Sequence, residues 1–576
     1  MCGFVGGNNV GWNYGRGIES LRHRGPDSQK LASFNGATLG FARLSIIDPS
    51  HAADQPMISQ DQAVALVFNG EIYDYKALRE EIAKEFKYEF LTHSDTEVLL
   101  AAYSHWGDRW VDHVDGMFAV AVVDQRQQKI KLFRDRVGIK PLYYFHDGHN
   151  FAFASELNAL VQCCSSVNFE IDYSALYDFL TYRYIPAPKT AYRYAYKLLP
   201  SHWLCFDIRT NQIDNISKYW SINPLVNGDN ISNADAVHHL ADLIDAAVKS
   251  QLVADVPVGC FLSGGVDSSA IVSSASLQCE RLKTFSIGFD VLSHSETTVA
   301  KSVAEMFCTE HYEEVLTAAE AGALVKMLPS WYGEPFGDTS AIPTYLVAKL
   351  ARRHVTVVLT GDGGDEIFGG YRWYRVFKQC TQTNGLRRLP LEHVFRFLKA
   401  GFRKQSLTYR VFNGLEGVFS DDLTLYAKLL RGLVASDKRA YADRWGIPSD
   451  YDDLWYFRQY WREDLPILTR LQYLDFHTYL PDDILTKVDR VTMAVSLEAR
   501  VPLLSQAIVE FMFSLPEVQR FLCGQLKGLF KRSLRGRLPP AILDRQKKGF
   551  SIPPAYYDSN ELSEHEELLK NVYGLI

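Results

Sequence analysis

One stretch near the middle of the chain constrains the fold more than any other. An apolar run at 256–262 is followed by a glycine-rich turn at 263–269, and a helical pattern begins at Ser268. A strand that leads through a tight turn into a helix is the unit from which parallel sheets are built. Two more apolar runs, 284–289 and 355–360, are separated by helical patterns. We therefore predict an α/β domain with a parallel sheet in the second half of the chain.

The glycine-rich turn is suited to hold an anion. Its sequence is Ser263-Gly264-Gly265-Val266-Asp267-Ser268-Ser269. Backbone N–H groups and the helix dipole at such a turn can bind pyrophosphate, and Asp267 is a candidate Mg²⁺ ligand because hard cations prefer carboxylate oxygens. The turn lacks the ending of a Walker A loop and the spacing of a dinucleotide-binding loop. A plain Gly-Gly turn with a serine helix cap is the alternative.

A second loop, directly after the run at 355–360, carries three carboxylates among three glycines. It comprises Thr360-Gly361-Asp362-Gly363-Gly364-Asp365-Glu366. Such acidity alone would repel a nucleotide, but a bound Mg²⁺ inverts the local charge and turns the loop into a platform for metal and phosphate. Asp365 is therefore a second metal candidate. The alternative is a solvated acidic turn.

The first 160 residues have a different pattern. β-branched and aromatic residues gather in short runs typical of antiparallel strands, at 63–69, 117–123, 129–134 and 151–154. Two helices are expected between them, at 77–86 and 95–103. We predict an α+β domain in which helices pack against antiparallel sheets.

Prolines are frequent from 181 to 225, as is typical of connecting structure, and the pattern from about Gln379 onward is mainly helical. We therefore expect two domains, at 2–210 and 235–560. The fold class is then α+β for the first and α/β with a helical C-terminal part for the second.

Charge and hydropathy exclude several functional classes. The net charge of −7 gives no overall basic field for a nucleic acid, and the apolar runs are shorter than a membrane span requires. The N-terminus has no basic segment of the kind that precedes a secretory signal. The nine cysteines include no C-x-x-C pair, which argues against a zinc site or a disulfide framework. We expect a cytoplasmic protein that has no nucleic-acid partner, and a homodimer is compatible with the sequence.

Cys2 stands out among the cysteines because of its position. Loss of Met1 would leave its thiol beside its own α-amino group, and that amine, with a pKa near 8, can act as the general base for the nucleophile. One residue then supplies both nucleophile and base. Met-Cys-Gly on its own also occurs by chance.

Longer strings give the N-terminal cysteine its context. The first 160 residues resemble the class II glutamine amidotransferase domain, of Ntn-hydrolase type, found in glutamine-dependent asparagine synthetases. The matching strings are Met1-Cys2-Gly3, Arg22-His23-Arg24-Gly25-Pro26-Asp27, Arg43-Leu44-Ser45-Ile46-Ile47-Asp48, Asn69-Gly70-Glu71-Ile72-Tyr73, Ser94-Asp95-Thr96-Glu97 and Arg134-Asp135-Arg136-Val137-Gly138-Ile139-Lys140-Pro141. The second half resembles the same family's ATP-pyrophosphatase domain in the two loops above, in Lys487-Val488-Asp489-Arg490 and in Ser496-Leu497-Glu498-Ala499-Arg500-Val501-Pro502.

The resemblance implies roles for residues of the first half. Cys2 would attack the glutamine amide, and Asn69 with the Gly70 N–H would form the oxyanion hole. Arg43 would bind the glutamine carboxylate, while Glu71 and Asp95 would hold its α-ammonium.

In the second half, the resemblance implies binding of ATP, with Mg²⁺. The expected contacts come from Leu262, Ser263, Gly264, Gly265, Asp267, Ser268, Ser269, Ile287, Thr360 and Gly361. A catalytic lysine would be Lys527, in Gly524-Gln525-Leu526-Lys527, although Lys531 is close enough to compete.

The sequence leaves the identity of the acceptor carboxylate open. Asp362 stands where the best-known asparagine synthetases carry glutamate, in a form that resembles a longer bacterial branch with members proposed to amidate uronic acids of surface polysaccharides. Ser505 stands where the family usually has aspartate. We predict an ATP-dependent amidoligase that hydrolyses glutamine at Cys2 and passes ammonia to an adenylylated carboxylate held near Asp362, with aspartate as the leading acceptor. A uronic-acid sugar is the alternative acceptor, and a non-catalytic glutamine or ATP sensor is the alternative from another class.

Overall fold

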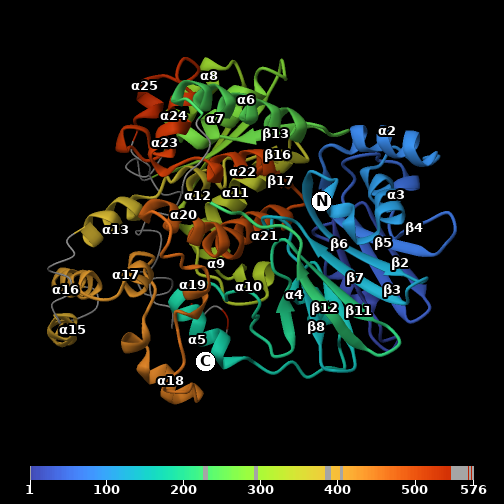
Figure 1. Cartoon of the computed structure of the whole chain (residues 1–576), viewed down its shortest axis with the longest axis horizontal. Coiled ribbons are helices and arrows are strands. Elements are labelled where there is room, and N and C mark those ends of the chain that lie inside the picture. The colour runs from blue at the N-terminus through green and yellow to red at the C-terminus, as the bar shows by residue number, and fades with distance from the viewer. Residues whose placement is uncertain are drawn as a thin grey trace.

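The computed structural model describes residues 2–224, 231–290, 296–382, 391–402, 406–545, 568, 569 and 573. In its first half, two antiparallel six-stranded sheets lie face to face (Figure 1). One sheet has the order β10 (Ala195–Lys197), β8 (Tyr143–His146), β9 (Phe151–Ala154), β1 (Gly3–Gly7), β3 (Ala37–Arg43) and β2 (Ser28–Phe34). The other has the order β12 (Gln212–Lys218), β11 (His202–Asp207), β7 (Lys129–Arg134), β6 (Gly116–Asp124), β5 (Val64–Ile72) and β4 (Met57–Ile58).

Helices cover the outer faces of this sandwich. Apolar side chains such as Phe4 and Val67 fill the space between the two sheets. α1 (Tyr14–Glu19) and α4 (Leu157–Cys163) pack on the first sheet, and α2 (Tyr75–Phe86) and α3 (Asp95–Trp106) pack on the second. The predicted α+β fold of antiparallel sheets between helices is confirmed, and each predicted helix or strand lies within three residues of its observed bounds.

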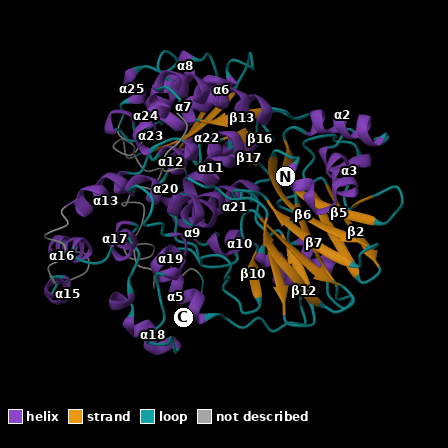
Figure 2. Cartoon of the chain, in the orientation of Figure 1, coloured by secondary structure: helices purple, strands orange, loops and turns teal. Residues whose placement is uncertain are grey.

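The second half contains a five-stranded sheet in which every neighbouring pair is parallel. Its order is β15 (Glu310–Leu316), β14 (Lys283–Phe289), β13 (Val258–Phe261), β16 (Val357–Leu359) and β17 (Glu498–Arg500). Figure 2 shows this sheet surrounded by helices, as a parallel sheet buried on both faces requires. The predicted α/β fold of this half is confirmed.

Helices near the parallel sheet include α6 (Asn233–Gln251), which is capped at its N-terminus by Ser232, and α7 (Val266–Ala275). The others in this part are α8 (Thr297–Met306), α9 (Ala318–Val325), α10 (Leu328–Tyr332), α11 (Ala341–Arg352) and α12 (Gly364–Phe368). The later part is mainly helical, as predicted. It comprises α13 (Arg372–Gln382), α15 (Glu392–Ala400), α16 (Leu407–Val418), α17 (Asp422–Leu429), α18 (Arg439–Trp445), α19 (Trp455–Tyr460), α20 (Ile467–His477), α21 (Thr486–Met493), α22 (Gln506–Ser514), α23 (Glu517–Arg520), α24 (Gly528–Ser533) and α25 (Pro540–Leu543).

The two halves share buried contacts. Val357 and Met493 from the second half belong to the same apolar cluster as Phe68 of the first, and α5 (Tyr173–Tyr182) packs into the core of the second half. A buried ion pair also crosses the junction, since Arg24 donates 2.7 Å and 3.1 Å hydrogen bonds to Asp489. Among the described residues, helices long and apolar enough to cross a membrane are absent.

Candidate functional site

Cys2 lies at the junction end of the first half, one residue before β1. Its side chain is buried, and its thiol donates a weak 3.8 Å hydrogen bond to the Leu44 carbonyl oxygen. Burial raises the pKa of the Cys2 thiol above its ordinary value. A thiol that stays protonated near neutral pH needs a base to become a nucleophile, which fits the predicted use of the α-amino group.

Asn69 faces the nitrogen of Cys2 from the neighbouring sheet. Its Oδ1 accepts a 3.0 Å hydrogen bond from the Cys2 N–H, and this leaves the amide nitrogen directed elsewhere. Asn69 Nδ2 is buried and has no hydrogen-bond partner among the described residues. A buried donor without a partner is costly, and it is the kind of group that a developing oxyanion can satisfy.

Gly70 is packed too tightly for a side chain. A Cβ atom there would lie 2.0 Å from the Met117 carbonyl oxygen on β6. The backbone of this part of β5 is therefore fixed against its neighbour, which holds Asn69 and Gly70 in one orientation beside Cys2.

The other predicted glutamine ligands lie around the same end of the sheets. Arg43, the last residue of β3, is 5% exposed, and its Nη1 atom lies 2.8 Å from Asp54. Glu71 is buried on β5. Asp95 is the first residue of α3 and accepts a 3.2 Å hydrogen bond from the Ile72 N–H. Burial raises the pKa of Asp95 to about 6. The structure thus brings all five predicted positions to one region.

Strand β17 of the second half also reaches this region, although the sequence assigned it no role. Arg500 Nη2 lies 3.5 Å from Glu71 Oε2, and Glu498 accepts a 2.6 Å hydrogen bond from Arg500 Nε. Both residues belong to a string quoted for the family resemblance. Their position beside Glu71 was not predictable, because it depends on packing between residues more than 420 positions apart.

The two loops of the second half meet at the C-terminal ends of β13 and β16. Gly361 comes so close to the first turn of α7 that a Cβ atom would lie 2.8 Å from the Ser268 nitrogen. A Cβ at Gly364 would lie 2.7 Å from Asp267 Oδ1. The glycines therefore allow the acidic loop (360–366) and the serine-rich loop (263–269) to form one surface. This is the edge where ligands bind in open α/β sheets.

Lys527 joins the two loops. Its Nζ atom is 2.6 Å from each oxygen of Asp267 and 2.7 Å from Asp365 Oδ1. Gly370, a residue that the sequence did not single out, gives the lysine its space, since a Cβ there would lie 2.1 Å from Lys527 Cε. The half-buried Lys531 lies one turn further along α24, and burial lowers the pKa of its amine. Lys527, rather than Lys531, therefore forms the ion pairs with Asp267 and Asp365.

The two metal candidates converge on one point, because Asp267 and Asp365 both contact the Lys527 ammonium. Among the described residues there is no group of three or more His, Cys, Asp or Glu side chains that could hold a metal ion. Two carboxylates fit Mg²⁺ only if it takes its remaining oxygens from phosphates and water, as this ion commonly does.

The remaining predicted ATP contacts surround the same loops. Leu262, Ser269, Ile287 and Thr360 are buried, and Ser269 Oγ has no hydrogen-bond partner in the described part of the chain. Gly264 has a φ of +74°, which a residue with a side chain adopts only with strain. Ser263 and Ser268 bond each other through their hydroxyl groups at 3.0 Å, across the turn that Gly265 completes.

A buried lysine that the sequence did not assign lies near Asp362. Lys487, the second residue of α21, is 7% exposed, and its Nζ atom is 3.4 Å from Asp338 Oδ2. Although burial opposes it, the charges of Asp338, Asp362 and Asp483 raise the pKa of Lys487. The structure therefore places a buried cation within electrostatic reach of Asp362.

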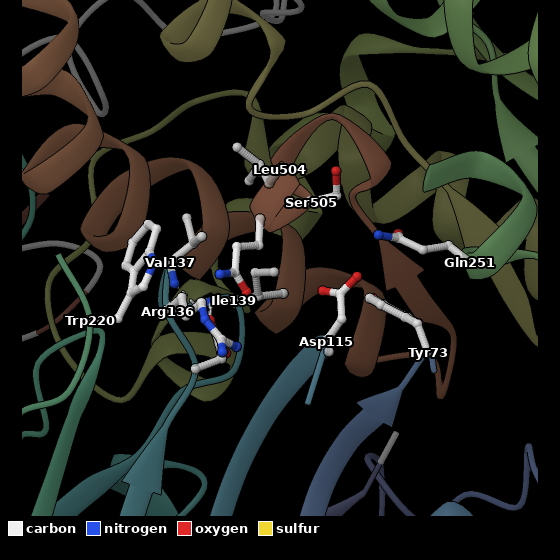
Figure 3. A pocket seen from close by; sticks show the side chains of 12 residues that line it. Tyr73, Asp115, Arg136, Val137, Ile139, Trp220, Gln251, Leu504 and Ser505 are labelled. Carbon is white, nitrogen blue, oxygen red and sulfur yellow. Dashed lines mark hydrogen bonds between the residues drawn. The ribbon is translucent and has the colours of Figure 1, made fainter. Parts of the chain in front are cut away.

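A pocket lies between the two halves, apart from these residues. Figure 3 shows Tyr73 and Asp115 of the first half facing Gln251 and Ser505 of the second. The Tyr73 hydroxyl, Gln251 Oε1 and Ser505 Oγ are buried and lack hydrogen-bond partners among the described residues. None of the predicted catalytic residues lines this pocket. The two candidate centres are therefore identified from contacts between their side chains and not from this pocket.

Two protein-family models match successive parts of the chain. The family model described as asparagine synthase matches residues 239–571, and the glutamine amidotransferase domain model matches residues 1–220. Asparagine synthetase [glutamine-hydrolyzing] 1 of Bacillus subtilis is 34% identical over 95% of this chain and 84% of its own length. A putative asparagine synthetase [glutamine-hydrolyzing] of Mycobacterium tuberculosis is 33% identical over 93% of this chain and 83% of its own.

Proposed function

The chain belongs to the glutamine-hydrolysing asparagine synthetase family, and on that premise we propose that it converts aspartate to asparagine with ammonia released from glutamine at Cys2. The family establishes an ATP-using, glutamine-hydrolysing ligase. The residue roles and the acceptor are our proposal. Two domains, at 2–210 and 235–560, would divide the work between them.

The glutamine reaction follows from the surroundings of Cys2. In the full sequence its nitrogen is a peptide N–H; removal of Met1 makes it an amine that can take the thiol proton. The thiolate attacks the side-chain amide of glutamine, and Asn69 Nδ2 and the Gly70 N–H stabilise the oxyanion. Ammonia leaves, and water hydrolyses the thioester to glutamate. Arg43, Glu71 and Asp95 would hold the two charged groups of the substrate.

The synthetase reaction begins at the joined loops. A carboxylate oxygen of the acceptor attacks the α-phosphorus of ATP, pyrophosphate leaves, and ammonia then displaces AMP to give the amide. The serine-rich loop and Thr360–Gly361 would bind the nucleotide, and Lys527 would offset charge on the leaving pyrophosphate. Mg²⁺, if held by Asp267 and Asp365, would neutralise phosphate charge when bound.

The observation that favours aspartate is the buried Lys487. Aspartate keeps a second carboxylate when the first is adenylylated, and a buried carboxylate requires a cation. Lys487 supplies a cation near Asp362, with a 3.4 Å contact to Asp338 as its nearest ion pair. A buried ammonium of this kind is suited to a small dicarboxylate acceptor.

The test is release of AMP and pyrophosphate by the full chain with ATP and Mg²⁺, with glutamine or ammonia as nitrogen source. Release stimulated by L-aspartate, together with asparagine formation, supports the proposal. Stimulation only by glucuronate or another uronic acid would assign the uronate alternative instead. If no acceptor stimulates turnover and glutamine is not hydrolysed, the chain is a sensor rather than an enzyme.

A variant of the acceptor side sharpens this test. Lys487→Met should raise the KM for aspartate about 10-fold or more, because a charge-assisted contact is lost, and leave glutamine hydrolysis unchanged. Lys283→Met, at the half-buried start of β14, is the matched control and should change neither quantity. An unchanged KM in Lys487→Met would remove the argument for aspartate.

A further inference from the structure

The glutamine site contains charged residues from both halves of the molecule. Glu71 is buried on β5, while Glu498 and Arg500 belong to β17 at the edge of the parallel sheet and are fully buried. The Arg500 guanidinium lies between the two glutamates, 2.6 Å from Glu498 Oε1 and 3.5 Å from Glu71 Oε2. The parallel sheet thus contributes a cation to the predicted site of glutamine binding.

The position of this guanidinium is fixed by the backbone around it. Arg500 Nη1 donates 2.7 Å hydrogen bonds to the carbonyl oxygens of Gln251 and Val253. The Arg500 carbonyl oxygen accepts a 2.9 Å hydrogen bond from the Thr360 N–H, at the head of the acidic loop. Arg500 Nη2 remains buried, with Glu71 as its ion-pair partner and no hydrogen bond among the described residues.

Arg500 favours the ionised form of Glu71 against the effects of burial and of Glu498. Burial and the neighbouring Glu498 both raise the pKa of Glu71 well above its ordinary value, and Arg500 opposes that rise. A carboxyl group that takes up a proton no longer attracts an ammonium group. Asp95 is subject to the same opposing effects of Glu498 and Arg500.

We propose that Arg500, although carried by the synthetase half, is a positioning residue of the glutamine site: its guanidinium pairs with the carboxyl group of Glu71 and holds it in place for the α-ammonium of glutamine. The inference rests on the proposed role of Glu71. It implies that the first half alone has an incomplete glutamine site and that the synthetase half completes it.

The test compares two substrates of the full chain, glutamine and glutaramate, which is the same amide without the α-ammonium. Glutamate or glutarate release is measured for the wild type, Arg500→Gln and Arg500→Lys. We expect Arg500→Gln to raise the KM for glutamine about 10- to 100-fold, with kcat and the KM for glutaramate nearly unchanged. Arg500→Lys keeps the charge but loses the planar guanidinium, so its KM for glutamine should lie between those of the wild type and Arg500→Gln.

Arg537→Gln is the matched control. Arg537 also forms a bidentate ion pair in the synthetase half, with Asp245. Its loss should leave the KM values for glutamine and glutaramate unchanged. If Arg500→Gln does not fold, the comparison of Arg500→Lys with the wild type decides.

Three results would overturn the inference. An equal rise in KM for both amides would indicate a merely structural role for Arg500. A wild type that discriminates between the amides, with variants that do so equally, would refute the role of Arg500 while leaving that of Glu71 intact. A wild type that does not discriminate would refute the role of Glu71 as well.

Discussion

The glutamine end and the nucleotide end of this molecule differ in how the polar groups at their centres are paired. At the glutamine end, Asn69 Nδ2 is a buried donor without a partner in the described structure. At the nucleotide end, Asp267 and Asp365 are both paired with Lys527. The first end has a buried donor without a partner in the described structure, whereas at the second end one lysine is shared by two carboxylates.

The difference follows from the substrates that the two ends would take. Glutamine brings a neutral amide to Cys2, and charge develops on its oxygen only during reaction, so an unpaired donor is best placed in advance. ATP brings several negative charges, and acidic side chains near it need a cation at all times. Four experiments test this difference between the two ends.

Cys2→Ala should separate the two ends completely. Glutamine-dependent activity should fall to background, because the nucleophile is gone, while ammonia-dependent AMP release should persist. Both rates are measured on the same preparation with saturating ATP and acceptor. Equal loss with the two nitrogen sources would contradict the division into two centres.

Lys527→Met should have the converse effect. We expect acceptor-dependent AMP release to fall about 10³-fold with either nitrogen source, since charge on pyrophosphate loses its partner, while glutamine hydrolysis continues. Lys531→Met is the control and should retain most of the activity. If Lys531→Met were the more damaging change, the assignment of the lysine would be reversed.

Asn69→Ala should reduce the kcat of glutamine hydrolysis about 10²-fold, the usual cost of one oxyanion-hole donor. Steady-state glutamate release measures it, and ammonia-dependent synthesis should be unaffected. A change confined to KM would show that Asn69 binds glutamine in the ground state and does not act on the transition state.

Acidic pH should weaken glutamine binding. The pKa of Asp95 is raised to about 6, chiefly by burial, so the carboxylate is lost as the pH falls through that value. The KM for glutamine should therefore rise about 10-fold between pH 7 and pH 5. Asp95→Asn should have a high KM throughout and a flatter profile; an unchanged profile would exclude Asp95 as the titrating group.

Much of the fold was predictable because local patterns carry it. The alternation of short apolar runs gave the antiparallel strands of the first half, and the strand–turn–helix unit at 256–275 gave the parallel sheet. The resemblance assigned Cys2 and Asn69 to glutamine hydrolysis and the two loops to ATP binding. The structure brings Cys2 and Asn69 together at one site and the two loops together at another.

Other features depended on tertiary structure. Lys527 and Lys531 have the same residue type and lie four positions apart, so the sequence could not choose between them. Lys527 precedes α24 and packs against Gly370, which places it on Asp267. The position of Arg500 beside Glu71 likewise has no local signature.

The sequence by itself determined which chemical groups this protein has and in which kind of element each one lies, because strands, turns and caps are set by neighbouring residues. Tertiary structure alone decided which groups share a site. Charged side chains from the two halves meet at their junction because burial forces each to find a partner, however distant in the chain.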